Sequence, residues 1–272
     1  MELETTEQLE LMLKEIESWE KEQDDLWFWE KIGRIPFLIL DKITPKFIHK
    51  KINLILEELG SYIDNGGKYL TSQKQVLKRF SKYNIDIDVN EMNETHSTIP
   101  IEIMDRVSQE IRKSHKDIAT LQGATTGFGG FITLAIDIPA ILGLSLKTLQ
   151  DIAISYGYDP RNKEERIFII KCLQFASSDI VGKKAILNDL KNFNSRDKEK
   201  EALSQIQGWR EVILVYKDNF GWKKLFQMIP IAGMVFGAFI NKQSIEDVAE
   251  AGIMLYKKRR IIERLTSHQL ES

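Results

Sequence analysis

The sequence has few of the residues that build disulfides or metal sites. Its single cysteine, Cys172, excludes an internal disulfide and a zinc site made of several thiolates. That cysteine lies within a helical apolar pattern, so we expect a packed and unreactive thiol. The histidines are His49, His96, His115 and His268. None is spaced to place two ligands on one helix face, and we expect neither a metal ion nor a cofactor.

The chain also lacks a large net charge. Its formal charge is -2, and no basic stripe with interleaved aromatic residues is present, which argues against nucleic-acid binding. The charges are nevertheless unevenly distributed, since 1–25 is acidic, 26–82 is basic and the last predicted helix ends in a basic run. The cations that we predict to contact an anionic surface are Lys223, Lys224, Lys257, Lys258, Arg259 and Arg260. The alternative, which we favour, is that acidic and basic segments complement one another within the fold.

Strand-like alternation of apolar and polar residues is nearly absent, whereas helical periodicity runs through almost every segment. We therefore predict an all-α protein, a multi-helix bundle with a central glycine-rich apolar helical hairpin and no substantial sheet. The polar segment 84–98 is interpreted as a surface loop. It divides an N-terminal helical region, 1–83, from a main helical domain, 84–272, and we expect the two to pack as one unit. The acidic N-terminus has no secretory signal pattern, so we expect a peripheral protein on the cytoplasmic side of the membrane, with a soluble cytoplasmic protein as the alternative.

No apolar run is both long and unbroken enough to cross a membrane comfortably. In "GATTGFGGFITLAIDIPA", residues 123–140, we expect Asp137 to cap a new helix with Pro139 in its first turn. This predicts two short helices, 126–136 and 138–156. A second apolar run, 225–240, contains Pro230, and we predict a separate last helix over 245–265, capped by Ser244.

The glycines of these two runs are spaced for close helix packing. Gly123 and Gly127 are four residues apart, as are Gly233 and Gly237, so each pair places small residues one turn apart. The strand and lysine context of a phosphate-binding loop is missing, so no nucleotide is predicted. We expect the two runs to pack together, either in a soluble core or as a membrane-facing surface. The residues assigned to this role are Gly123, Gly127, Phe128, Gly129, Gly130, Phe131, Asp137, Pro139, Pro230, Gly233, Phe236, Gly237 and Phe239.

A catalytic constellation is not evident. No G-x-S-x-G elbow occurs, and the acid pair Glu164/Glu165 is interpreted as part of a solvated helix face. Asn162 and Glu165 are spaced as a capping box. Asp137 is the best single candidate for a polar function because its apolar neighbours would raise its pKa, although a capping role is favoured.

The motifs together resemble the EcsC family of bacteria. The resemblance rests on "TGFGG", the step "DIP", the turn "YGYD", the helix start "ER" and the later "PIAGMVFGA". The matching residues are Gly127, Gly129, Gly130, Asp137, Pro139, Tyr156, Gly157, Glu165, Arg166, Pro230, Gly233 and Gly237. The family is named after a gene beside those of an ABC transporter linked to protein secretion and processing at the membrane. The resemblance implies that neighbourhood and carries no catalytic mechanism.

Three functional hypotheses follow. The first is a non-enzymatic accessory protein, peripheral at the membrane, whose apolar glycine-rich helices dock on a membrane surface or on a membrane protein such as ABC transporter subunits. The alternative is a hydrolase acting on lipid or peptide at the membrane surface, using Asp137 or the pair Glu165 and Arg166. A third possibility is an integral protein with a re-entrant hairpin.

Overall fold

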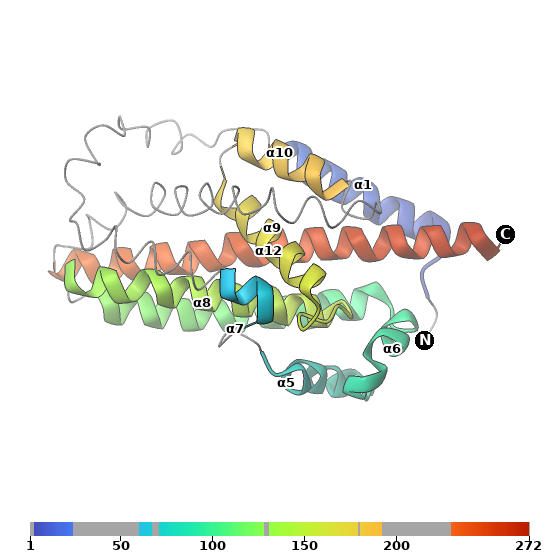
Figure 1. Cartoon of the computed structure of the whole chain (residues 1–272), viewed down its shortest axis with the longest axis horizontal. Coiled ribbons are helices and arrows are strands. Elements are labelled where there is room, and N and C mark those ends of the chain that lie inside the picture. Colours follow the sequence, from blue (N-terminus) through green and yellow to red (C-terminus); the bar gives the residue numbers. More distant parts are fainter. Residues whose placement is uncertain are drawn as a thin grey trace.

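The computed structural model describes residues 3–23, 60–66, 71–127, 131–178, 180–191 and 230–271. Every regular element in these ranges is a helix, which confirms the all-α prediction. Three long helices form the centre of the molecule, and shorter helices pack around them (Figure 1).

The three central helices are α7 (Ile101–Gly127), α8 (Phe131–Ser155) and α12 (Pro230–Glu271). Helix α7 runs antiparallel to α12, because Asp105 binds Lys257 at 2.7 Å whereas Lys116 binds Glu246 at 3.2 Å. Helix α8 runs antiparallel to α7 and therefore parallel to α12. The end of α7 and the starts of α8 and α12 consequently lie at the same end of the bundle, at the left of Figure 1.

The predicted break at Asp137 is wrong. Helix α8 is continuous from Phe131 to Ser155, so both Asp137 and Pro139 lie inside it and Asp137 caps no helix start. Helix α7 ends at Gly127, and the antiparallel helix α8 begins at Phe131. A proline inside a helix removes one backbone hydrogen bond, a cost that the rest of this long apolar helix outweighs.

The predicted helix start at Ser244 is also wrong. Helix α12 extends without interruption over 42 residues, and Pro230 is its first residue. Proline suits that position because the first N–H groups of a helix have no partner within it. The apparent capping signal at Ser244 therefore lies in a helix interior, where packing against α7 and α8 overrides local preference.

The N-terminal helix α1 (Thr6–Glu22) packs along α12, and its start is fixed by a capping box between Thr5 and Gln8. Leu9 and Ile16 are buried, as their spacing predicts. The short helix α5 (Gln73–Leu77) packs on α8 and continues as the 3-10 helix η2 (Lys78–Tyr83). These contacts join the region 1–83 to the helices of 84–272, while the boundary between the two remains a prediction.

The polar segment 84–98 contains no strand, as expected, but it is more ordered than a surface loop. It forms the 3-10 helix η3 (Val89–Glu91) and helix α6 (Met92–Ser97). Met92 and His96 are buried, so this segment contributes to the core. The alternation at Ile85 and Ile87 reflects partly buried side chains that pack on that core.

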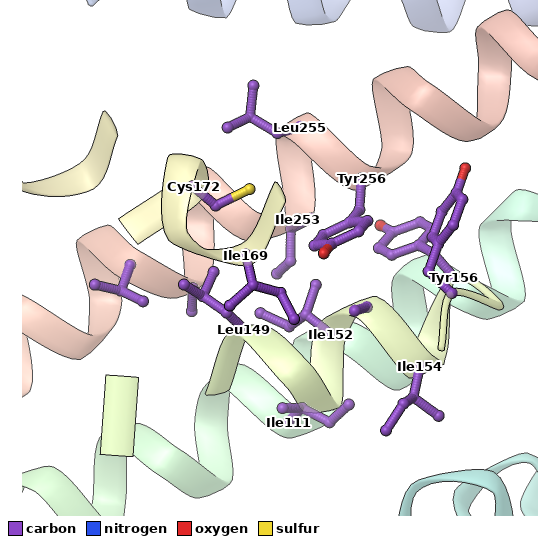
Figure 2. Close-up of a cluster of buried hydrophobic side chains, with 14 of the residues drawn as sticks. Ile111, Leu149, Ile152, Ile154, Tyr156, Ile169, Cys172, Ile253, Leu255 and Tyr256 are labelled. Atoms are coloured by element: carbon purple, nitrogen blue, oxygen red, sulfur yellow. The ribbon is translucent and has the colours of Figure 1, made fainter. Parts of the chain in front are cut away.

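The main core lies between α7, α8, α12 and helix α9 (Lys163–Ser177). Figure 2 shows Ile111, Leu149, Ile169 and Ile253 meeting there from these four helices. Cys172 is fully buried and free, as predicted. Helix α10 (Ile180–Lys191) follows α9 and packs against it. The buried face of α7 includes Met104, Val107 and Ile111, whereas Ile118 is 48% exposed.

Candidate functional site

The glycine-rich segments of the central helices meet at one end of the bundle. We define this glycine-rich end as the last part of α7 (118–127), the first part of α8 (131–146) and the first part of α12 (230–241). Across these ranges Asp137 is the sole ionisable residue in the sequence. The backbone of Phe131, Asp137, Pro139, Pro230, Gly233, Phe236, Gly237 and Phe239 is placed here. Phe128, Gly129 and Gly130 lie outside the described residues, between α7 and α8.

The outer face of α7 changes character toward the glycine-rich end. Through its first turns, Glu102, Arg106 and Lys113 are exposed. Beyond Asp117 the exposed positions carry no charge: Ile118 is 48% and Leu121 68% exposed, and Thr125 is also exposed, whereas Gly123 is buried. Exposed apolar side chains of this size favour contact with another surface, because that contact removes them from water.

A layer of ionic contacts borders the glycine-rich end on the side toward the rest of the bundle, and it joins the three central helices. On α12, Glu246 binds Arg112 at 2.6 Å and Lys116 at 3.2 Å, and both cations belong to α7. On α8, Asp151 lies 3.2 Å from His115 Nε2 of α7 and 3.0 Å from Lys147 Nζ. We call this set the ionic layer. It fixes the register of the helices because a one-turn slip would separate the pairs that join different helices.

Electrostatics keep both carboxylates of the ionic layer charged. Burial raises the pKa of Asp151, but hydrogen bonds from His115 and Thr71 and the charge of Lys147 outweigh it, so the pKa lies below its ordinary value. The pKa of Glu246 is lowered in the same way, since Arg112 and Lys116 outweigh desolvation. Because an ionised carboxylate only accepts hydrogen bonds, His115 donates from Nε2 to Asp151. The sequence does not indicate most of this layer, although the i, i+4 spacing of Lys147 and Asp151 is a signal for part of it.

The basic run at 257–260 is engaged within the fold. Lys257 binds Asp105 at 2.7 Å, Lys258 binds Glu20 of α1 at 2.7 Å, and Arg259 binds Glu165 at 2.8 Å. Arg260 donates from Nε to the carbonyl of Tyr156 at 3.1 Å. The side chains of these four cations are 12–20% exposed. The structure thus matches the favoured alternative for this run, with acidic and basic segments complementing one another, and gives no support to an anionic-surface role. Lys223 and Lys224 lie outside the described residues.

Glu165 is buried, so its interpretation as part of a solvated helix face is wrong. Asn162 occupies the N-cap position of α9 but makes no side-chain capping bond, so the predicted capping box is absent. Glu165 instead accepts a hydrogen bond from Tyr256 at 2.5 Å and forms an ion pair with Arg259. Burial raises the pKa of Glu165 against the opposing effects of Arg259 and Tyr256.

Arg166 faces away from Glu165 and binds main-chain carbonyls. It donates to the carbonyls of Ile63 at 2.8 Å and Asp64 at 3.0 Å, and also to those of Pro160 and Arg161. These bonds hold the end of the helix at 60–65, where Gly66 supplies a left-handed cap with a φ of 78°. Glu165 and Arg166 are therefore separate structural anchors and do not converge on one reaction centre.

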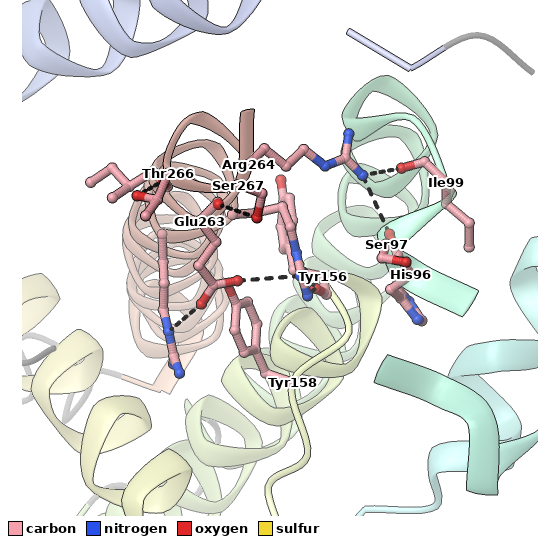
Figure 3. A network of polar contacts seen from close by, with 12 residues as sticks. His96, Ser97, Ile99, Tyr156, Tyr158, Glu263, Arg264, Thr266 and Ser267 are labelled. Carbon is pink, nitrogen blue, oxygen red and sulfur yellow. Dashed lines mark hydrogen bonds and ion pairs between the residues drawn. The ribbon is translucent and has the colours of Figure 1, made fainter. Parts of the chain in front are cut away.

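The opposite end of the bundle carries a second polar cluster, shown in Figure 3. Tyr158 donates to Glu263 at 2.9 Å, and Arg264 reaches the carbonyls of Ile99 and His96. Burial lowers the pKa of His96 to about 4; the charges of Arg260 and Arg264 add to this effect, while a hydrogen bond to the Met92 carbonyl opposes it. His96 is thus neutral at ordinary pH.

Other chemistry is not indicated by the described residues. Within 3–23, 60–66, 71–127, 131–178, 180–191 and 230–271, no three histidine, cysteine or acidic side chains gather as a metal site. In the same ranges, no helix combines the length and the apolar character that crossing a membrane requires. The thiol of Cys172 is buried, and desolvation raises its pKa well above the ordinary value, which disfavours the nucleophilic thiolate.

Comparisons with known proteins agree with the sequence resemblance. The model of the EcsC protein family matches residues 10–261. The chain is 55% identical to the uncharacterized protein YdbA of Bacillus subtilis, over all of this chain and 99% of that protein. It is 28% identical over 146 residues to the protein EcsC of Bacillus subtilis, which covers 54% of this chain and 59% of that protein. No solved structure matches.

Proposed function

Because the chain belongs to the EcsC protein family, we propose that it is an accessory protein that docks on a membrane through its glycine-rich end. The observation that carries the proposal is the convergence of three nearly uncharged helix segments at one end of the bundle, together with the exposed Ile118 and Leu121. Burying exposed apolar surface is favourable by about 25 cal/mol per Å², so this end provides a driving force for docking.

In this proposal the protein docks on the lipid surface itself, and it assists transport proteins that are embedded in the same membrane. Subunits of an ABC transporter are the partners that the family resemblance implies. Docking would be driven mainly by apolar contacts, because the cations at 257–260 bind partners within the fold. Binding should therefore persist at high salt, since screening weakens contacts between exposed charges far more than apolar burial.

Vesicle flotation tests the proposal. We expect the purified full-length protein to float with vesicles of phosphatidylethanolamine and phosphatidylglycerol, and the double variant Ile118→Glu/Leu121→Glu to remain at the bottom of the gradient. Leu11→Glu is the matched control, because Leu11 is an equally exposed leucine, 61%, on α1 at the other half of the bundle. The control variant should float like the unmodified protein.

Two outcomes would count against the proposal. If the unmodified protein floats with no vesicle, the lipid surface is not its target; flotation restricted to vesicles that contain a reconstituted transporter would replace lipid by protein as the docking partner. If all three proteins float equally, the glycine-rich end is not the docking surface.

The hydrolase alternative gains no support from the described residues. Glu165 and Arg166 are both buried and engage different partners, Tyr256 with Arg259 in one case and backbone carbonyls in the other. A general acid or base must reach its substrate, and neither group is placed to do so here.

A further inference from the structure

The ionic layer bounds the glycine-rich end at a similar level on all three central helices. The first charged residues above that end are Asp117 and Lys116 on α7, Lys147 on α8 and Lys242 on α12. Their levels agree because Lys116 contacts Glu246, one turn beyond Lys242, and the neighbouring His115 contacts Asp151, one turn beyond Lys147. The end of the bundle is thus divided from the rest by a charged boundary.

The length of the glycine-rich end matches one leaflet of a bilayer. Its segments contain 10 residues on α7, 12 on α12 and 16 on α8, which at 1.5 Å per residue correspond to about 15, 18 and 24 Å. A whole bilayer is about 40–45 Å thick with a hydrocarbon core of about 30 Å, so one leaflet offers roughly 20 Å. The segments of α7 and α12 fit within this depth, and that of α8 exceeds it by about 4 Å, so the three adjacent segments reach about the middle of the bilayer.

We propose that the glycine-rich end inserts into one leaflet of an anionic membrane, to a depth that the charged boundary fixes. This inference rests on the proposed docking function and adds its depth and its lipid class. Lys116 and Lys147 limit the depth of insertion, because they and their partners Glu246 and Asp151 form a charged layer. Moving charges into hydrocarbon costs free energy. Helical backbone satisfies its own hydrogen bonds except in the terminal turns, so these segments meet most of the requirement of the hydrocarbon region.

We expect the glycine-rich end to prefer anionic lipid because of Lys242. Its side chain is exposed at the boundary, next to the predicted headgroup level. A lysine near an anionic surface contributes about 1 kcal/mol, which is a factor of about five in partitioning. We therefore expect Lys242→Gln to lower the partition coefficient on phosphatidylglycerol vesicles about fivefold and to leave binding to phosphatidylcholine unchanged. Lys14→Gln, at an exposed lysine of α1, is the matched control and should change neither.

Nitroxide depth measurement tests the insertion itself. Full-length variants with one added cysteine at Thr125, Leu121, Lys113 or Leu11 carry the label at exposed positions, while the native thiol of Cys172 is buried. On vesicles, labels at Thr125 and Leu121 should collide more with oxygen, which concentrates in hydrocarbon, than with a polar nickel chelate. The label at Thr125 should be the deeper of the two. Labels at Lys113 and Leu11 should show the opposite preference.

The results separate this inference from the proposed function. If the protein floats with vesicles but all four labels stay accessible to the nickel chelate, docking stands and insertion is overturned. If Lys113 is as deep as Leu121, the charged boundary does not set the depth. If no variant and no unmodified protein binds vesicles, both proposals fail.

Discussion

At the scale of single residues, the turn after α8 shows how closely backbone and side chains approach one another. Gly157 has a φ of 85°, in the left-handed region that side chains other than glycine rarely adopt. A Cβ atom placed there would lie 2.6 Å from His96 Cβ and 2.7 Å from Arg260 Nη2. The motif "YGYD" therefore has a structural explanation, since this glycine lets α6, α8 and α12 meet.

Gly157→Ala should lower the free energy of unfolding by about 1–3 kcal/mol from backbone strain, with a further loss from the contacts with His96 and Arg260. Gly60→Ala is the control, because Gly60 is helical and a Cβ there meets nothing within 4 Å. This control should be neutral or slightly stabilising. Urea denaturation of the three proteins measures the difference, and equal stabilities would contradict the role assigned to Gly157.

His96 should make folding sensitive to mild acid. Its pKa is about 4 in the folded protein and about 6.5 in the unfolded chain, so between these values the unfolded state binds more protons. Stability is therefore fully present above pH 6.5 and is lost as the pH falls toward 4. The loss is at most a few kcal/mol, because one pKa unit corresponds to about 1.4 kcal/mol.

Urea denaturation from pH 7 to pH 4 measures this effect. His96→Gln removes the titrating group, so this variant should show a flatter dependence in that window even if it is less stable throughout. His268→Gln is the control, since this histidine lies at an exposed contact with Thr6. An unchanged slope in His96→Gln would show that His96 does not carry the effect.

At the scale of whole elements, α1 is attached to α12 by a small separate core and by polar contacts beside it. Leu9 and Ile16 pack with Ile101 and Ile261. Trp19 Nε1 donates to Glu250 at 2.7 Å, and Glu20 pairs with Lys258. The acidic helix α1 thus pairs with part of the basic run of α12. The opposite charges of these two segments are therefore complementary within the fold.

Ile16→Ala should lower the free energy of unfolding by about 2–4 kcal/mol, because it removes a fully buried side chain from the core between α1 and α12. Leu11→Ala lies on the exposed face of the same helix and should change stability by less than about 0.5 kcal/mol. Thermal unfolding followed by circular dichroism compares the two variants. A similar effect of both would mean that α1 does not dock by the face described.

The helices themselves were largely predictable from the sequence, whereas their ends were less so. Helical periodicity runs through α1, α9 and the first part of α7, because one face of each is buried against a core. Local signals failed at Asp137 and Ser244, where a capping residue lies inside a long helix. Their meaning depends on tertiary packing, which a sequence window does not contain.

The polar interior was harder to predict than the helices. His115 and Asp151 are 36 positions apart, and Glu165 meets Arg259 across 94 positions. Such pairs form only when the helices pack in one particular register, and local sequence patterns do not determine that register. Conversely, the glycine-rich segments were recognised from composition and spacing, and the backbone brings them to one end of the bundle.

At the scale of the whole molecule, the central bundle has two chemically different ends. One end is glycine-rich, with a single ionisable residue in its sequence, and lies beyond the ionic layer. The other carries α1, α6 and the polar cluster around Tyr158, Glu263 and Arg264. This polarity suggests an orientation in which the glycine-rich end faces the membrane and the opposite end remains in water.

Amide hydrogen exchange with and without phosphatidylglycerol vesicles tests this orientation most directly. The account predicts that vesicles slow exchange in 118–127, 131–146 and 230–241, and leave exchange in α1, α6 and the last turns of α12 unchanged. Slower exchange confined to α1, α6 or the end of α12, with none at the glycine-rich end, would contradict it.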